Sequence, residues 1–122
     1  MKSMLHESEL RVLEILWNKG DTAAKDLAAS LKQSVGWHKS TSYTVIQKCI
    51  GKGLIGRLEG DFICYANLEK AEAQKKEASL LADKMFNGSA DLLIASLLGS
   101  NKLTNAQVNQ LRNMVQEFSE EA

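Results

Sequence analysis

The sequence lacks several features by which common protein classes are recognised. It has only two cysteines, Cys49 and Cys64, in apolar surroundings and without C-x-C or C-x-x-C spacing. This spacing disfavours a disulfide framework and a dedicated metal site, so we expect both thiols to be free and buried. No apolar run approaches the roughly 18 residues that a membrane span needs, and no apolar stretch of signal-peptide length lies near residue 1. We therefore expect a cytoplasmic protein without a membrane partner.

Sequence signals for catalysis and for cofactor binding are also missing. The chain has no G-x-S-x-G, H-E-x-x-H or glycine-rich phosphate loop. Its two histidines, His6 and His38, are far apart and have no evident Asp or Cys partner that would complete a metal or catalytic site. We therefore expect neither an enzyme nor a protein that carries a metal ion or another cofactor.

Acidic residues are absent from one long segment. From Leu27 to Leu58 there is no Asp or Glu. The basic residues inside this segment are Lys32, Lys39, Lys48, Lys52 and Arg57. Because the whole chain has 15 basic and 15 acidic residues, the indication of a polyanionic partner comes from this acid-free segment and not from net charge. With 44% hydrophobic and 25% charged residues, the composition is that of an ordinary globular protein.

The hydrophobic pattern predicts three helices in the first part of the chain. They are expected at about Glu7 to Lys19, residues 23–32, and Lys39 to Lys52. Either His6 or Ser8 can cap the first helix, and Gly20 is suited to end it. Thr22 is expected to cap the second helix, because its hydroxyl can accept an unpaired backbone N–H.

The third predicted helix has two different faces. Its inner face is expected to pack into the core and carries Ser42, Val45, Ile46 and Cys49. Its outer face is polar without acid and carries Ser40, Tyr43, Thr44, Gln47, Lys48 and Gly51. Two short strands, Ile55 to Leu58 and Phe62 to Ala66, are expected after it around the turn Glu59-Gly60-Asp61. Three helices followed by a hairpin is the order of a winged helix-turn-helix.

A change in composition after Asn67 predicts three more helices. The first covers residues 68–86 and ends near Asn87-Gly88, the second covers about 90–98 and stops at Gly99, and the third begins with a T-x-x-Q capping box at Thr104. These helices offer an apolar seam of Leu92, Leu93, Leu97, Val108, Leu111, Val115 and Phe118. We expect this seam to pair with a second copy of the chain, and the alternative is a purely intramolecular core.

The expected architecture is therefore mainly α with a small β-hairpin wing. An N-terminal winged helix-turn-helix domain, residues 1–67, is followed by a three-helix C-terminal dimerisation region, residues 68–122.

The polar face of the third helix suits DNA, because a major groove admits an α-helix and short polar side chains can read base edges there. The candidate DNA-binding residues are Lys39, Ser40, Thr41, Tyr43, Thr44, Gln47, Lys48, Lys52 and Arg57. The alternative function is a winged helix that binds a partner protein and no DNA.

Several segments resemble one family of bacterial regulators. They are ESELRVLEILWNKG, the stretch from Trp37 to Thr44, KGLI at Lys52 to Ile55, Tyr65, and KMFNGS at Lys84 to Ser89. In order and spacing, the chain resembles the penicillinase-repressor family of winged-helix transcription factors. The resemblance implies a homodimeric transcriptional repressor of palindromic operator DNA. Its DNA-contacting helix would be Lys39 to Lys52, with Thr41 and Thr44 at recurrent threonines.

The chain departs from this family at the positions where its members sense their signals. Members that respond to β-lactams are cleaved at an Asn-Phe bond, and the matching pair here is Ser96-Leu97. Members that respond to copper carry C-x-C motifs at the C-terminus, whereas this chain ends in MVQEFSEEA. The family's serine and proline before the recognition helix are His38 and Lys39 here. The resemblance therefore leaves the upstream sensor or protease unidentified.

Overall fold

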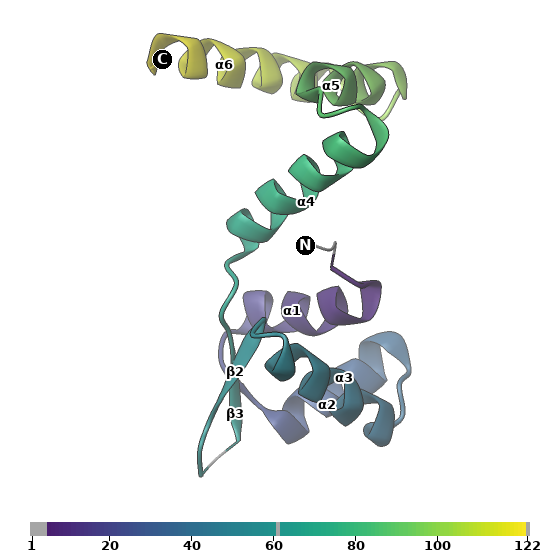
Figure 1. The fold of residues 1–122 in the computed structure, drawn as a ribbon, viewed down its shortest axis with the longest axis vertical. Coiled ribbons are helices and arrows are strands. Elements are labelled where there is room, and N and C mark those ends of the chain that lie inside the picture. Colours follow the sequence, from purple (N-terminus) through teal and green to yellow (C-terminus); the bar gives the residue numbers. More distant parts are fainter. Residues whose placement is uncertain (1–4, 61, 122) are drawn as a thin grey trace. The chain divides into compact units, whose positions relative to one another are not determined.

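The computed structural model describes residues 5–60 and 62–121 (Figure 1). The elements are α1 (Glu7–Lys19), β1 (Thr22–Ala23), α2 (Ala24–Val35), α3 (Lys39–Gly51), β2 (Ile55–Leu58), β3 (Ile63–Ala66), α4 (Lys70–Met85), α5 (Ala90–Gly99) and α6 (Asn105–Glu121). The predicted order of three helices, a hairpin and three further helices is confirmed. Within the described residues, none of the helices combines the length and the apolar character needed to cross a bilayer.

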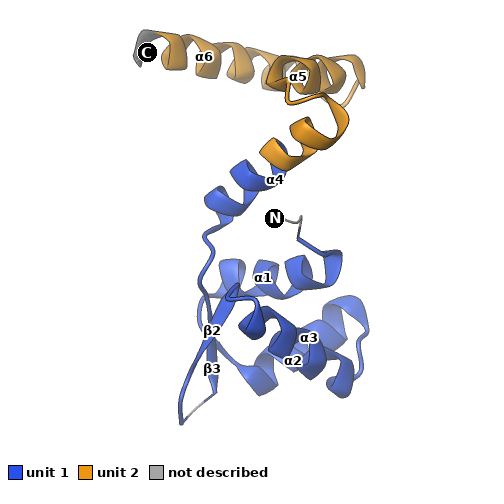
Figure 2. Ribbon diagram, in the orientation of Figure 1, with its two compact units in different colours: residues 1–78 blue, residues 79–122 orange. Residues whose placement is uncertain are grey.

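The chain forms two compact units, residues 1–78 and residues 79–122 (Figure 2). The division falls inside α4, so this helix belongs to both units. The wing ends earlier, at Ala66. The sequence-based boundary between residues 67 and 68 thus lies directly after the wing.

The first helix begins and ends as the sequence predicts. His6 is the N-cap of α1, and its backbone N–H donates to Oε1 of Glu9 at 2.9 Å. Of the two capping candidates, the structure therefore selects His6 over Ser8. Gly20 follows Lys19 with a φ of 83°, a conformation that strains any residue with a side chain, and its N–H donates to the carbonyl of Leu16.

The predicted role of Thr22 is wrong. The N-cap of α2 is Ala23, and Thr22 with Ala23 forms the short strand β1, which the sequence analysis missed. The Thr22 hydroxyl donates to the carbonyl of Gly20 at 2.8 Å instead of accepting a helix N–H. A strand of two residues has no periodicity of its own, so only its pairing with a distant strand defines it.

The wing is a three-stranded antiparallel sheet in the order β1-β3-β2. Thr22 pairs with Cys64 on one side of β3, and Arg57 pairs with Cys64 on the other. Gly56 lies opposite Tyr65, and a Cβ atom at this glycine would overlap the tyrosine ring. Residue 56 must therefore be glycine for Tyr65 to lie across the hairpin as it does.

One hydrophobic core holds α1, α2, α3 and the sheet together. Its buried members are Val12, Leu13, Leu16, Ala24, Leu27, Leu31, Val45, Ile46, Cys49, Ile55 and Cys64. Trp17 and Trp37 pack against this core while partly buried, as expected of packing residues. The indole N–H of Trp17 donates to the carbonyl of Leu68 at 2.8 Å, which fixes the segment that leads into α4.

Both cysteines are free and buried, as the sequence predicts. Burial is the main cause that raises the pKa of the Cys49 thiol to about 11, and it raises the pKa of Cys64 as well. Near neutral pH both side chains are therefore uncharged thiols and behave as small apolar groups.

The helices of the second unit begin and end close to the predicted positions. After α4, Asn87 and Gly88 both have positive φ, 53° and 78°, which reverses the chain. The capping box before α6 is confirmed, because the Thr104 N–H donates to Gln107 Oε1 at 2.9 Å and the Gln107 N–H donates to Thr104 Oγ1 at 3.1 Å. As predicted, α5 ends at Gly99, which is its last residue, and Ser100 is the C-cap.

A buried carboxylate links α1 to the end of α3. Glu9 is 2% exposed, accepts the His6 N–H and forms an ion pair with Lys52, the C-cap of α3. Burial by itself raises the pKa of Glu9, but the ion pair and the two hydrogen bonds outweigh it and hold the pKa below the ordinary 4.5. The charged carboxylate is therefore the form that the fold stabilises.

The substitution Glu9→Gln is expected to lower the free energy of unfolding at pH 7 by about 1–2 kcal/mol, because it removes the charge that Lys52 pairs with. Lys52 is 45% exposed and can turn to water, which keeps the loss small. Since the folded pKa is depressed, the contribution of Glu9 is present above pH 4.5 and lost as the pH falls through the folded pKa. Urea unfolding between pH 7 and pH 4 is expected to show that the free energies of unfolding of the variant and the unchanged protein approach each other as the pH falls.

The matched control is Glu14→Gln, at an exposed position on the same helix. This change is expected to alter the free energy of unfolding by less than about 0.5 kcal/mol at either pH. A loss for Glu9→Gln that stays constant across the pH series contradicts the role assigned to its charge.

Candidate nucleic-acid interface

Helix α3 is fixed by one face and presents the other to solvent. Its buried residues are Ser42, Val45, Ile46 and Cys49, the four predicted for the inner face. His38 is the N-cap, without a side-chain hydrogen bond to the helix, and the first turn contains no acidic residue. The N-terminal N–H groups and the positive end of the helix dipole therefore face a region free of side-chain carboxylates from α3 itself.

The outer face of α3 is accessible along its length. Ser40, Thr41, Thr44, Gln47 and Lys48 are exposed, and Tyr43 is half-buried. The Thr44 hydroxyl donates to the carbonyl of Ser40 at 2.9 Å, so its oxygen remains available as an acceptor. Tyr43, Thr44, Gln47 and Lys48 line a shallow hollow of about 490 Å³. This surface offers hydrogen-bonding groups to a large partner and does not enclose a small one.

Two lysines that the sequence analysis did not select extend the basic surface. Lys25 and Lys32 of α2 line a hollow of about 260 Å³ together with Lys39 at the start of α3, and Ala28 and Ala29 form its floor. All three lysines are exposed. The seven-residue spacing between Lys25 and Lys32 places them on one face of a helix, and this signal could have identified them.

The predicted basic residues near the wing have local partners. Lys52 is paired with the buried Glu9, so its charge already has a counterion in the protein. The Arg57 guanidinium lies over the Phe62 ring, 5.1 Å from its centroid, and Arg57 is exposed. Lys39 lies 5.9 Å from the centroid of the Tyr43 ring. Of the turn Glu59-Gly60-Asp61, Asp61 lies outside the described residues.

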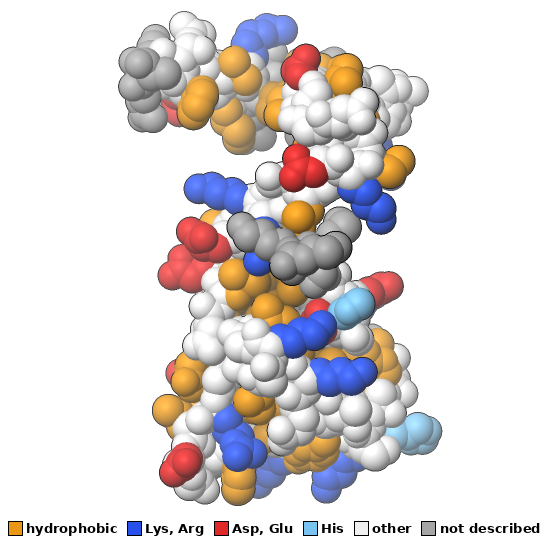
Figure 3. All heavy atoms as spheres, viewed as in Figure 1, with side chains coloured by type: hydrophobic (Ala, Val, Ile, Leu, Met, Phe, Trp, Pro, Cys, Tyr) orange, Lys and Arg blue, Asp and Glu red, His pale blue; other side chains and the backbone are white. Residues whose placement is uncertain are grey.

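The residues of the predicted dimerisation seam lie on α5 and α6. Leu92, Leu97, Val115 and Phe118 are exposed, whereas Leu93, Val108 and Leu111 are half-buried. Ile94, Leu98 and Met114 are further exposed apolar residues on these two helices that the sequence analysis did not select. Figure 3 shows hydrophobic side chains at the surface of this unit.

The described part of the chain contains no group of three or more His, Cys, Asp or Glu side chains arranged to hold a metal ion. The exposed face of α3 carries polar and basic side chains. The family described as penicillinase repressor matches residues 5–117. The chain belongs to the penicillinase repressor family. As a member of this family, it is a transcriptional repressor and not an enzyme.

Two related proteins match this chain over most of its length. The methicillin resistance regulatory protein MecI of Staphylococcus aureus is 22% identical over 113 residues, which cover 91% of this chain and 92% of MecI. An uncharacterised 16.5 kDa protein of Latilactobacillus sakei is 26% identical over 110 residues, covering 88% of this chain and 75% of that protein.

A solved structure confirms the fold of the first unit. The solution structure of the DNA binding domain of the repressor BlaI matches with a TM-score of 0.51 and 22% identity, covering 59% of this chain and 93% of that domain. The winged-helix fold predicted from the sequence is thus shown.

Proposed function

We propose that this repressor binds inverted-repeat operator DNA as a homodimer, with α3 of each copy in the major groove of one half-site. The observation that carries the proposal is the division of α3 into a buried face and an exposed face without acid. The buried face fixes the axis and rotation of the helix. The exposed face is then held toward the partner before binding, which lowers the entropic cost of recognition.

The exposed side chains of α3 suit the reading of base edges. The amide of Gln47 can donate and accept at the same time, as recognition of adenine N6 and N7 requires. Thr44 offers a hydroxyl acceptor and a methyl group, which suits contact with a thymine methyl. Ser40 and Thr41, in the first turn, lie beside the free N–H groups of the helix start and suit phosphate. Tyr43, half-buried at the edge of this face, supports Lys39.

Basic side chains supply the affinity that does not depend on sequence. Lys39, Lys48 and Arg57 are exposed and have no carboxylate partner among the described residues, and Lys25 and Lys32 extend the set. We leave Lys52 out of the proposed phosphate contacts because Glu9 already neutralises it. Four or five phosphate contacts per copy predict a steep loss of affinity with salt, since each contributes about −0.9 to the logarithmic slope.

The exposed apolar side chains of α5 and α6 support pairing with a second copy. Leu92, Leu97 and Leu98 are each about half exposed, and Phe118 is 73% exposed. No residue of α5 is buried, although this is the most apolar helix of the chain. Contiguous apolar surface of this kind marks an interface, and homodimers are its commonest form. We accordingly propose residues 1–67 for DNA binding and residues 68–122 for dimerisation.

The competing function is a winged helix that binds another protein through α3. A binding assay with random duplex DNA at a series of salt concentrations separates the two. Micromolar or tighter binding that weakens steeply with salt supports the repressor. Absence of binding at low salt overturns the proposed interface. Selection from a random DNA library then gives the half-site sequence and the spacing, which an inverted repeat must show.

The substitution Lys48→Ala is expected to weaken binding to random and selected DNA alike and to make the salt slope shallower by about one phosphate. Lys102→Ala, in the exposed segment before α6, is the matched control and is expected to change neither quantity. Fluorescence anisotropy at several salt concentrations provides both measurements. An unchanged slope for Lys48→Ala contradicts its placement at the phosphate backbone.

Replacing Gln47 by alanine is expected to relax the sequence preference and to leave binding to random DNA nearly unchanged. One good bidentate contact discriminates between bases by about 1–3 kcal/mol, or roughly ten- to hundredfold. Repeating the library selection with the variant shows which operator position loses its preference. If every position of the consensus is retained, Gln47 does not read a base.

The substitution Phe118→Asp is expected to shift the protein from dimer to monomer, because it places a carboxylate in an interface that excludes water. Phe118 is 73% exposed in the single chain, so the change tests association and not folding of the monomer. Sedimentation velocity measures the shift, with Gln116→Asp on the exposed surface of the same helix as the control. A Phe118→Asp protein that still sediments as a dimer rules out this part of the seam.

A further inference from the structure

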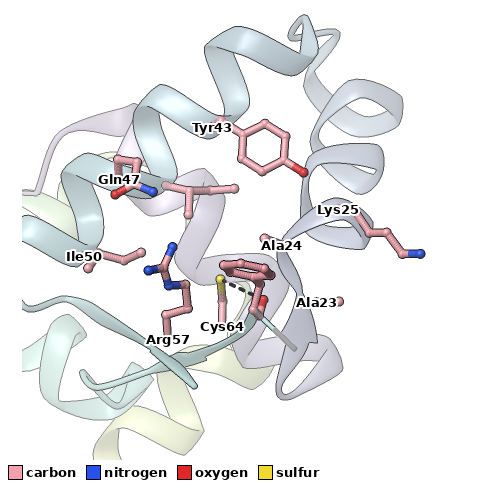
Figure 4. Close-up of a pocket in the computed structure, with 10 residues that line it drawn as sticks. Ala23, Ala24, Lys25, Tyr43, Gln47, Ile50, Arg57 and Cys64 are labelled. Atoms are coloured by element: carbon pink, nitrogen blue, oxygen red, sulfur yellow. Dashed lines mark hydrogen bonds between the residues drawn. The ribbon is translucent and has the colours of Figure 1, made fainter. Parts of the chain in front are cut away.

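A cavity lies between α3 and the wing, and DNA recognition does not account for its shape. Its volume is about 350 Å³, within the range of small-molecule sites. Its lining comes from β1, the start of α2, α3, both strands of the hairpin and Phe62 just before β3 (Figure 4). The cavity is thus open to solvent on one side and lined by elements whose relative positions the core fixes, so it exists before any ligand arrives.

Most of the lining is apolar. The apolar side chains are Ala23, Ala24, Ile46, Ile50, Phe62 and Cys64, and the others are Lys25, Tyr43, Gln47 and Arg57. Ile46 and Cys64 are buried and form the deepest part, and Phe62 forms an exposed wall. Because burial raises the pKa of the Cys64 thiol, this side chain is uncharged and adds to the apolar floor. A flat hydrocarbon body fits this lining.

One end of the cavity is cationic. Arg57 reaches from β2 toward Gln47 of α3 (Figure 4), with its guanidinium over the Phe62 ring. None of the lining residues is acidic, and the ion pairs among the described residues do not include Arg57. A guanidinium with no ion-pair partner among the described residues, beside an apolar wall, suits the carboxylate of a ligand whose ring packs against that wall.

We propose that this cavity binds a small aromatic carboxylate, with its ring on Ile46, Ile50 and Phe62 and its carboxylate on Arg57. A DNA phosphate, the other anion that could reach Arg57, is a poorer occupant. Phosphate sites are built from N–H donors, whereas six of the ten lining residues here are apolar. The Lys25 side chain points away from the cavity in Figure 4 and adds no second charge to it.

Occupancy of the cavity has a consequence for the proposed function. Gln47 and Arg57 line the cavity and also belong to the proposed DNA surface. A carboxylate held by Arg57 neutralises one phosphate contact and places an anion where the DNA backbone is expected. The ligand should therefore weaken operator binding. This consequence rests on the proposed function, whereas binding of the ligand to the free protein does not.

The test uses the 122-residue chain without DNA and 2-naphthoate as the probe, with the uncharged 2-naphthamide as the matched ligand. Methyl NMR spectra are expected to show saturable shifts at Ile46 and Ile50, and naphthoate should bind about tenfold or more tightly than the amide. Arg57→Gln should remove this preference and leave amide binding unchanged. Arg11→Gln, on α1 and outside the cavity, should preserve the preference.

Absence of saturable shifts at Ile46 and Ile50 overturns the site, and so does equal binding of naphthoate and its amide. A preference that survives in a folded Arg57→Gln protein removes the assigned contact.

A separate titration measures duplex DNA binding in the presence of naphthoate, and the affinity for DNA is expected to fall about tenfold. If the ligand binds but DNA affinity is unchanged, only the inhibitory consequence fails. If the protein binds no DNA, the proposed function fails and the NMR result still decides the site.

Discussion

The placement of α3 in the core is the constraint on which the rest of the structure depends. Val45, Ile46 and Cys49 pack with residues of α1, α2 and the sheet, so the helix cannot rotate without exposing them. This packing alone decides that Thr44, Gln47 and Lys48 face outward. The ion pair between Glu9 and Lys52 adds a second restraint at the C-terminal end of α3, beside the buried Cys49. Orientation of the polar face is thus a consequence of burying the apolar one.

The same packing explains how a chain without net charge can present a basic surface. Before the wing, the acidic residues lie on α1, at Asp21 and at Asp26 in the first turn of α2, so none lies between Leu27 and Leu58. The one buried carboxylate near α3, Glu9, is neutralised inside the protein by Lys52. The remaining lysines of α2 and α3 therefore have no acidic neighbour after Asp26 within these two helices. At a distance below the Debye length of about 8 Å, such a local excess matters more than total charge.

Much of the fold could be predicted from the sequence because most of its elements have strong local signals. The bounds of α1, the inner face of α3 and the capping box before α6 follow from apolar spacing and capping chemistry. What could not be predicted depends on partners distant in sequence. Thr22 pairs with Cys64, and Lys52 pairs with Glu9. Neither contact can be recognised from the residues that neighbour these positions in the sequence. The cavity beside Arg57 is of the same kind, since five separate elements, β1, α2, α3, β2 and β3, line it.

The exposed apolar surface of α5 and α6 bears on affinity as well as on assembly. The four or five phosphate contacts proposed for one copy would support only weak binding at physiological salt. In the proposed dimer, the two copies are joined through residues 68–122, so binding of the second half-site becomes intramolecular and occurs at a raised effective concentration. Affinity for an inverted repeat then depends on the dimer, whereas affinity for one half-site does not. A repressor built this way can be released by any event that separates the two copies, even if the surface of α3 stays intact.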